Sequence, residues 1–172
     1  MTEDTGTHKD GPGPAAAESE ERFSVTRRID APPSRIFRLL CDPNGHVAID
    51  STGMLQSADG DRVRGAGDEF EVHMDRESLG DLPMGRYDVT VQITRFEQDR
   101  LLEWTIRGTI KPPLRHLYGY RLEPDGGGTR VTSYYDWSRI DEAYRDAGVF
   151  PVIPEAGLKA TLGILARTVE RP

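Results

Sequence analysis

The chain has 172 residues, a formal net charge of −7 at pH 7 and a hydrophobic content of 36%, enough for one domain with a single core. It has no cluster of lysine and arginine, which makes nucleic acid an unexpected partner. We expect a cytoplasmic location, because no stretch approaches the ~18 apolar residues of a membrane span, no signal peptide is recognisable, and the single Cys41 cannot form an internal disulfide.

The first segment is polar. Residues 1–21 are rich in acidic residues, glycine and proline, and contain no aromatic residue. Such a segment cannot bury enough apolar surface to offset the entropy lost when its backbone is ordered. We therefore predict a disordered acidic tail over residues 1–21, followed by a single domain over residues 22–172.

A strand and two short helices are predicted next. Apolar residues alternate over residues 23–29, which is typical of a strand. The following Asp-Ala-Pro-Pro ends the strand and favours a helix, because proline is tolerated in the first helical turn. Asp42 and Pro43 are typical of the N-cap and first position of a second short helix, over residues 43–49.

Strands then dominate as far as the last helix. From Gly67 to Trp137 apolar residues recur at every second position, the period of half-buried strands. The sequence Asp125-Gly-Gly-Gly128 is the clearest hairpin signal. Residues 76–83 and 138–154 are expected to be loops, and they are the candidate gates of a binding site, because loops can move without disturbing the sheet. Over residues 155–169 the apolar spacing changes to that of an amphipathic helix.

The lengths of these elements favour a curved sheet. The run over residues 85–96 would span about 40 Å as a strand, whereas a helix over residues 155–169 would span only about 23 Å. Long antiparallel strands covered by one short helix must coil around it. We predict an α+β fold in which this sheet wraps around the C-terminal helix, with the short helix pair after the first strand. A cavity is expected wherever side chains do not fill the space between them.

Two segments resemble signatures of a known superfamily. They are Ile29-Asp-Ala-Pro-Pro33 with Ile36-Phe37, and Leu122-Glu-Pro-Asp-Gly-Gly-Gly-Thr-Arg-Val131. Both are similar to the START and birch-pollen-allergen (SRPBCC) superfamily, and within it to bacterial proteins of the polyketide cyclase/dehydrase type. His46-x-x-x-Asp50-x-x-Gly53 resembles a segment of actinobacterial members, with Val47 where a proline is expected. The resemblance implies the helix-grip fold but no single activity, because this fold hosts binding proteins, transporters, receptors, cyclases and co-chaperones.

The inward positions of the strands and of the last helix are the candidate ligand-binding residues. They are Phe70, Val72, Tyr87, Val89, Trp104, Tyr118, Tyr120, Ser133, Tyr135, Trp137, Leu158 and Leu162. Their apolar bodies can line a cavity while their polar tips orient a ligand, or the same side chains can fill the core. The Ser133 hydroxyl can bond a ligand or a backbone carbonyl.

His46 and Asp50 are the candidate catalytic residues. On a helix over residues 43–49 they would lie one turn apart, so that the carboxylate could orient the imidazole as a general base. The alternative is that Asp50 begins the turn Asp-Ser-Thr-Gly53 by bonding its own backbone, while His46 only packs.

Three functions stay open. No spacing of His, Cys and Asp matches a zinc site, and no phosphate-binding loop is present, so neither a metal nor a cofactor is predicted. The scarcity of inward polar residues favours the binding of a small hydrophobic or amphipathic molecule over catalysis. We expect the protein to be a monomer or a weak homodimer. The alternatives are a cyclase or dehydratase that uses the same cavity, and a regulatory protein that binds a partner through its acidic tail or outer sheet.

Overall fold

The computed structural model describes residues 20–172, and the first 19 residues of the predicted tail lie outside this range. The elements are β1 (Arg22–Ile29), α1 (Pro33–Leu40), α2 (Pro43–Ile49), β2 (Leu55–Asp59), β3 (Glu69–Asp75), η1 (Glu77–Leu79), β4 (Arg86–Glu97), β5 (Leu101–Arg107), β6 (Leu117–Asp125), β7 (Gly128–Asp136), α3 (Glu142–Asp146) and α4 (Glu155–Glu170). This order agrees with the predicted one, including the short helix pair after the first strand, except that η1 and α3 are short helices within the segments expected to be loops.

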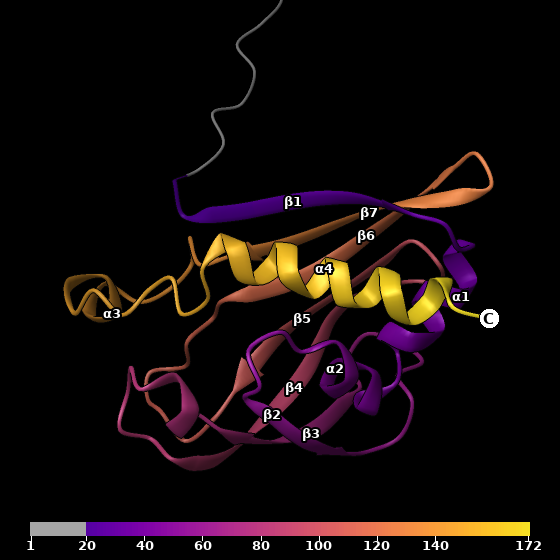
Figure 1. Cartoon of the computed structure of the whole chain (residues 1–172). Coiled ribbons are helices and arrows are strands. Elements are labelled where there is room, and N and C mark those ends of the chain that lie inside the picture. Colours follow the sequence, from indigo (N-terminus) through magenta and orange to yellow (C-terminus); the bar gives the residue numbers. More distant parts are fainter. Residues whose placement is uncertain (1–19) are drawn as a thin grey trace, which may run out of the picture.

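The strands form one antiparallel sheet in the order β1-β7-β6-β5-β4-β3-β2. From β2 to β7, strands that follow one another in sequence are neighbours in the sheet. Strand β1 pairs with β7, so β1 and β2 form the two edges of the sheet. The sheet curves, and α4 lies along its concave side (Figure 1). This is the helix-grip architecture that the sequence predicted.

Two local features shape the sheet. The register between β4 and β5 shifts between Ile93 and Arg95, and such a bulge bends a long strand and increases its twist. At the predicted hairpin, β6 ends at Asp125 and β7 begins at Gly128. The intervening Gly126 has a φ of 63°, a left-handed conformation that glycine adopts without steric cost.

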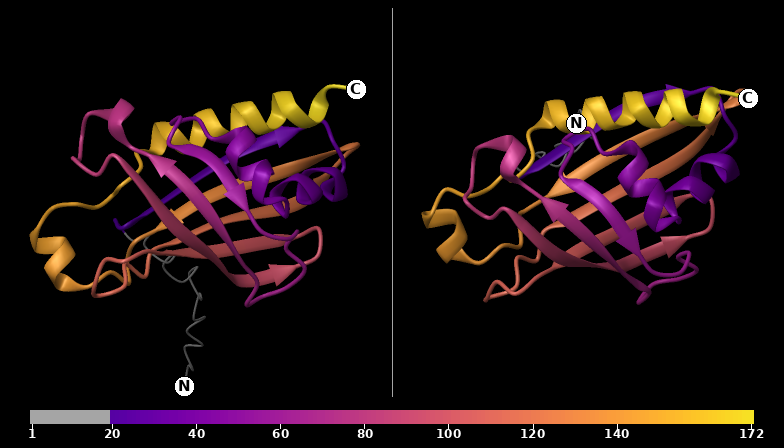
Figure 2. Two further views of the ribbon diagram at one scale, coloured as in Figure 1. Left: turned by 90° about the horizontal axis from the view of Figure 1, so that it is seen from below. Right: turned by 60° about the horizontal axis from the view of Figure 1, so that its bottom comes forward.

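Helix α4 covers the core with one face. Leu158, Leu162, Leu165, Ala166 and Val169 are buried on that face, at the spacing of successive helical turns. The helix packs against β1 and α2, so that the helix pair closes one end of the core. The opposite end, where α4 begins, is formed by loops (Figure 2).

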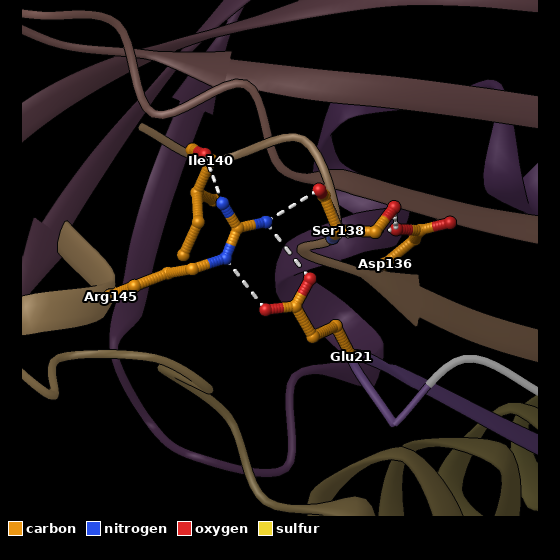
Figure 3. A network of polar contacts seen from close by, with 5 residues as sticks. All are labelled: Glu21, Asp136, Ser138, Ile140 and Arg145. Atoms are coloured by element: carbon orange, nitrogen blue, oxygen red, sulfur yellow. Dashed lines mark hydrogen bonds and ion pairs between the residues drawn. The ribbon is translucent and has the colours of Figure 1, made fainter. Parts of the chain in front are cut away.

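The folded part begins before Arg22. The sequence prediction assigned residues 20 and 21 to the disordered tail, whereas the structure places them in a turn. Glu21 forms a bidentate ion pair with Arg145 of α3, at 2.7 and 2.9 Å (Figure 3). Sequence patterns cannot reveal this pair, because its partners are separated by 124 residues.

Candidate ligand-binding cavity

A cavity of about 540 Å³ lies between the concave face of the sheet and the first turns of α4. Its wall is drawn from α4, from strands β2 to β7, from the end of α2 with the turn that follows it, and from three longer loops. These loops follow β3, β5 and β7, and they gather with α3 at the end of the molecule where α4 begins (Figure 2). The volume falls within the roughly 300–1,000 Å³ of small-molecule sites.

Most of the sequence-predicted ligand-binding residues lie in the cavity wall. They are Val72, Tyr87, Val89, Trp104, Tyr118, Tyr120, Ser133 and Leu158. Trp104 and Tyr118 stack with their ring centroids 5.9 Å apart and give the wall a broad aromatic surface. Aromatic surface of this kind favours apolar ligands with a planar or extended body.

Four other predicted residues are buried without lining the cavity: Phe70, Tyr135, Trp137 and Leu162. Tyr135 stacks on Tyr118 with a centroid distance of 4.4 Å, and Trp137 packs against Phe23 and Tyr135. The rings of Tyr135 and Trp137 thus pack behind the residues that line the cavity. Alternation places a residue on the inner face of a strand but does not say whether that part of the face meets open space.

The His46 side chain is almost fully buried and lies in the cavity wall. Its Nε2 donates to the carbonyl oxygen of Leu40 at 2.7 Å, which leaves Nδ1 without a proton in the neutral ring. The ring packs edge-on against Trp104, with a centroid distance of 4.9 Å. Burial lowers the pKa of His46 to about 4, so the ring is neutral at pH 7.

The Asp50 carboxylate holds the turn that follows α2. Its Oδ1 accepts from the backbone N–H and the hydroxyl of Thr52, at 3.0 and 2.7 Å, and its Oδ2 accepts from the N–H of Leu55 at 3.0 Å. Asp50 also lines the cavity. Both oxygens therefore have partners within this turn, as in the structural alternative considered from the sequence, and the carboxylate does not orient the His46 ring.

His116 is a wall residue that the sequence prediction left out. It is 3% exposed, and its Nδ1 lies 3.0 Å from the Tyr135 hydroxyl. Its Nε2 has no hydrogen-bond partner within the described residues, and burial lowers its pKa to about 4. His116 directly precedes β6 and lies two residues before Tyr118, so it has the same parity as Tyr118 and Tyr120. Extending the alternating pattern back to residue 116 could therefore have identified it.

Arg76 is the second omission. It follows β3 directly, its side chain is 8% exposed, and it lines the cavity. Its Nε and Nη2 donate to the two carboxylate oxygens of Asp81, at 2.9 and 2.7 Å. The sequence offered no signal for this pair, because Asp81 reaches Arg76 only after the loop turns at Gly80, where φ is 63°.

The loops at this end of the cavity carry exposed apolar side chains. Within residues 20–172 the exposed large hydrophobic residues are Leu79, Leu82, Met84, Ile110 and Val149. All except Leu79 also line the cavity. The two loops predicted as gates, residues 76–83 and 138–154, supply three of these five residues, and the loop after β5 adds Ile110.

The second gate segment is attached to the start of the domain. Arg145, besides its ion pair with Glu21, donates to the carbonyl oxygens of Ser138 and Ile140 at 2.6 and 3.2 Å (Figure 3). These contacts fold residues 138–145 into a compact corner. The cavity-lining Phe150 and Val152 follow this corner.

Comparison with protein families identifies the chain. Residues 20–170 match the family described as polyketide cyclase/dehydrase and lipid transport. The chain belongs to this family. None of the curated proteins matches the chain.

Solved structures show the same fold at low sequence identity. Protein CV1439 from Chromobacterium violaceum is 16% identical with a TM-score of 0.63, covering 88% of this chain and 99% of that one. Protein Ms6760 from Mycobacterium smegmatis is 18% identical with a TM-score of 0.60, covering 87% and 91%. The Aha1 dimer from Colwellia psychrerythraea is 14% identical with a TM-score of 0.57, covering 87% and 96%. At these identities the likeness concerns the fold alone.

Within residues 20–172, the arrangement most similar to a metal site is a cluster on the outer face of the sheet. Glu71, His73 and Asp88 bring possible ligand atoms within 4.8 Å of one another. The two ring nitrogens of His73 lie 2.7 Å from Asp88 and 2.8 Å from Asp59. Hydrogen bonds to these carboxylates raise the pKa of His73 to about 9. Both ring nitrogens thus have carboxylate partners, and the contacts describe an ionic cluster across β2, β3 and β4.

In the part of the chain that the structure covers, no helix has the length and apolar character needed to cross a membrane.

Proposed function

We propose that this family member binds one small hydrophobic or amphipathic molecule in the cavity between the sheet and α4. The supporting observation is a wall of mainly aromatic and aliphatic side chains around about 540 Å³ of space. Removing apolar ligand surface from water contributes ~25 cal/mol per Å², from which the cost of immobilising the ligand is subtracted. The family description, with its reference to lipid transport, supports the same class of ligand.

The binding proposal is favoured over the enzymatic alternative by the state of the predicted catalytic pair. Both oxygens of Asp50 hold the turn, and His46 donates to a carbonyl in a setting that lowers its pKa to about 4. A general base works best when its pKa lies near the operating pH. The third hypothesis places a protein partner on the acidic tail, which lies almost wholly outside the described residues, or on the outer face of the sheet.

Paired native and denaturing mass spectrometry tests the proposal on protein purified without detergent. A mass excess in the native spectrum that disappears on denaturation is the expected result, and solvent extraction then gives the chemical class of the ligand. If the native mass equals that of the polypeptide, titration with small apolar probes follows. The absence of any saturable binding in that titration would refute the proposal.

A matched pair of variants locates the ligand. Val89 lines the cavity from β4, whereas its neighbour Thr90 does not contribute to the cavity wall. We expect Val89→Trp to fill part of the cavity and weaken probe binding at least tenfold, and Thr90→Trp to leave it within about twofold. Equal affinities in the two variants would place the ligand elsewhere.

A further inference from the structure

Arg76 supplies the cavity wall with a buried guanidinium. Its Nε and Nη2 face Asp81, which is 45% exposed and belongs to the loop after β3. Two parallel N–H···O bonds of this kind hold the guanidinium in a fixed plane. The Nε and Nη2 atoms are therefore occupied by Asp81, and the third nitrogen, Nη1, is held in a fixed position.

Within the described residues, the hydrogen-bond partner found for Nη1 is a weak acceptor. Nη1 lies 3.4 Å from the thioether sulfur of Met54, and a thioether sulfur is a poor hydrogen-bond acceptor. Met54 is buried and lines the same cavity as Arg76. A charged N–H group beside cavity space is therefore available to an oxygen atom that a ligand brings.

Other contacts place this guanidinium beside the aromatic part of the wall. The pKa of Arg76 is raised by its hydrogen bonds to Asp81 and, to a smaller extent, by hydrogen bonding to the Tyr87 hydroxyl. The positive charge also reaches Tyr118, where it opposes the rise in the pKa of the phenol caused by burial. Tyr87 and Tyr118 are both wall residues, so the donor lies next to the surface on which an apolar body would pack.

Charge balance decides which oxygen suits this donor. The Asp81 carboxylate already neutralises Arg76 at 2.7 Å, so a ligand carboxylate would add an unbalanced negative charge near Asp81. Removing such a charge from water is costly unless a partner compensates it. Of the other basic residues in the wall, Arg107 is paired with Glu69, and Lys111 lies on an exposed loop at the rim. A neutral oxygen avoids this cost.

We propose that the ligand is a neutral, oxygenated apolar molecule, such as a ketone, ester or alcohol, whose oxygen accepts a hydrogen bond from Nη1 of Arg76. This proposal rests on the proposed binding function and narrows its ligand class. It assigns Arg76 as the polar anchor and Asp81 as the residue that positions it.

Three probes of equal chain length test the proposal on the wild-type chain: 2-decanone, decane and ionised decanoate at pH 8. Binding is followed by the fluorescence of the tryptophans, since Trp104 lies in the wall. We expect 2-decanone to bind about tenfold or more tightly than decane, as for a hydrogen bond to a charged group, and more tightly than decanoate. Equal binding of ketone and alkane, or tighter binding of decanoate, would overturn the proposal.

A charge-matched variant assigns the effect to the ion pair. The double substitution Arg76→Met, Asp81→Asn removes both charges together, and the control Arg86→Met removes an arginine whose side chain is 91% exposed. The preference for 2-decanone over decane should fall to within about twofold in the double variant and persist in the control. A preference that persists in the double variant would contradict the role of Arg76.

The outcomes separate the two proposals. If no probe binds at any accessible concentration, the binding function itself fails, and the assignment of Arg76 fails with it. If decane and 2-decanone bind equally well, the binding function stands and only the polar anchor is refuted. The wild-type comparison needs no substitution, so its result holds even if the double variant does not fold.

Discussion

The buried ionisable groups of the cavity wall, His46, His116 and Arg76, are either neutral or paired. His46 and His116 are uncharged at pH 7 because burial lowers the pKa of each to about 4. Arg76 keeps its charge and is paired with Asp81. The polar atoms of the wall therefore present hydrogen-bond donors and acceptors to a ligand without an excess of charge, which is consistent with a cavity for neutral molecules.

Acid should destabilise the fold through the two buried histidines. In the unfolded chain each titrates near pH 6.5, so as the pH falls from 6.5 towards 4 the unfolded state binds protons that the folded state does not. Each histidine then lowers the free energy of unfolding by up to a few kcal/mol, while no change arises above pH 6.5. Urea unfolding at pH 6.5, 5.5 and 4.5 measures this loss.

The substitution His116→Gln should make the loss of stability between pH 6.5 and 4.5 smaller, because glutamine does not titrate. His73 is the control, since its pKa is raised to about 9. The stability that His73 contributes is present below pH 6.5 and lost as the pH rises through 9, so His73→Gln should leave the acid loss in place. A wild-type stability that is equal at pH 6.5 and 4.5, a range over which the contribution of His73 is constant, would contradict the assignment.

Asp50 should matter to stability through its turn. Asp50→Ala removes three hydrogen bonds to Thr52 and Leu55, and we expect the free energy of unfolding to fall by about 1–3 kcal/mol. Asp50→Asn keeps one acceptor oxygen and should lose less. Chemical denaturation measures both values, and an unchanged stability in Asp50→Ala would show that water replaces these bonds without cost.

Among the helices and strands, α4 combines two tasks along its length. Its later turns bury Leu165 and Val169 in the core, whereas its first turns place Gly157, Leu158 and Thr161 at the cavity. The sequence pattern does not distinguish these two parts of α4, because the same apolar spacing runs through the whole helix. Only the position of the sheet below the helix decides which turns meet side chains and which meet open space.

Two glycines of α4 should differ in their tolerance of alanine. A Cβ at Gly163 would lie 3.7 Å from Nη1 of Arg27, an ordinary contact, whereas one at Gly157 would lie 3.0 Å from Cγ2 of Ile153. We expect Gly163→Ala to raise the free energy of unfolding by about 0.5–1 kcal/mol, through helix propensity, and Gly157→Ala to gain less or to destabilise. Urea titrations of both variants measure these changes in the free energy of unfolding. A larger increase in Gly157→Ala than in Gly163→Ala would contradict the prediction.

As a whole, the molecule is a curved sheet closed by one helix, with a core at one end and a cavity at the other. Helix α1 lies at the core end, where Arg35 donates to the carbonyl oxygen of Arg171, whereas α2 packs against α4 and reaches the cavity with His46 and Ile49. Loops after β3, β5 and β7 form the cavity end (Figure 2). Because the loops carry little of the core, they can adjust around a ligand while the sheet keeps its shape.

Ligand binding should therefore stabilise the whole domain. A ligand that binds only the folded state at 100 times its Kd adds ~2.7 kcal/mol to the free energy of unfolding, which for a domain of this size raises Tm by roughly 5–10 °C. We expect 2-decanone to give this shift in a thermal unfolding scan of the wild-type chain and a much smaller shift in Val89→Trp. An equal shift in both would show that stabilisation does not arise from the cavity.

The element order, the helix-grip fold and the parity of the inward residues follow from the sequence alone. Alternation, prolines at helix starts and the glycine hairpin are local signals, and each was read correctly from residues close together in the chain. The oligomeric state and the cytoplasmic location stay predictions.

The tertiary structure was needed to find where the inner face of the sheet meets open space and which polar groups lie there. Phe70 and Val72 share a face of β3, yet only Val72 lines the cavity. Arg76 was read as part of a loop, and its burial depends on how that loop folds back to bring Asp81 to the guanidinium. Cavity walls and ion pairs depend on the curvature of the sheet and on loop paths, which arise from packing between distant segments and leave no period in the sequence.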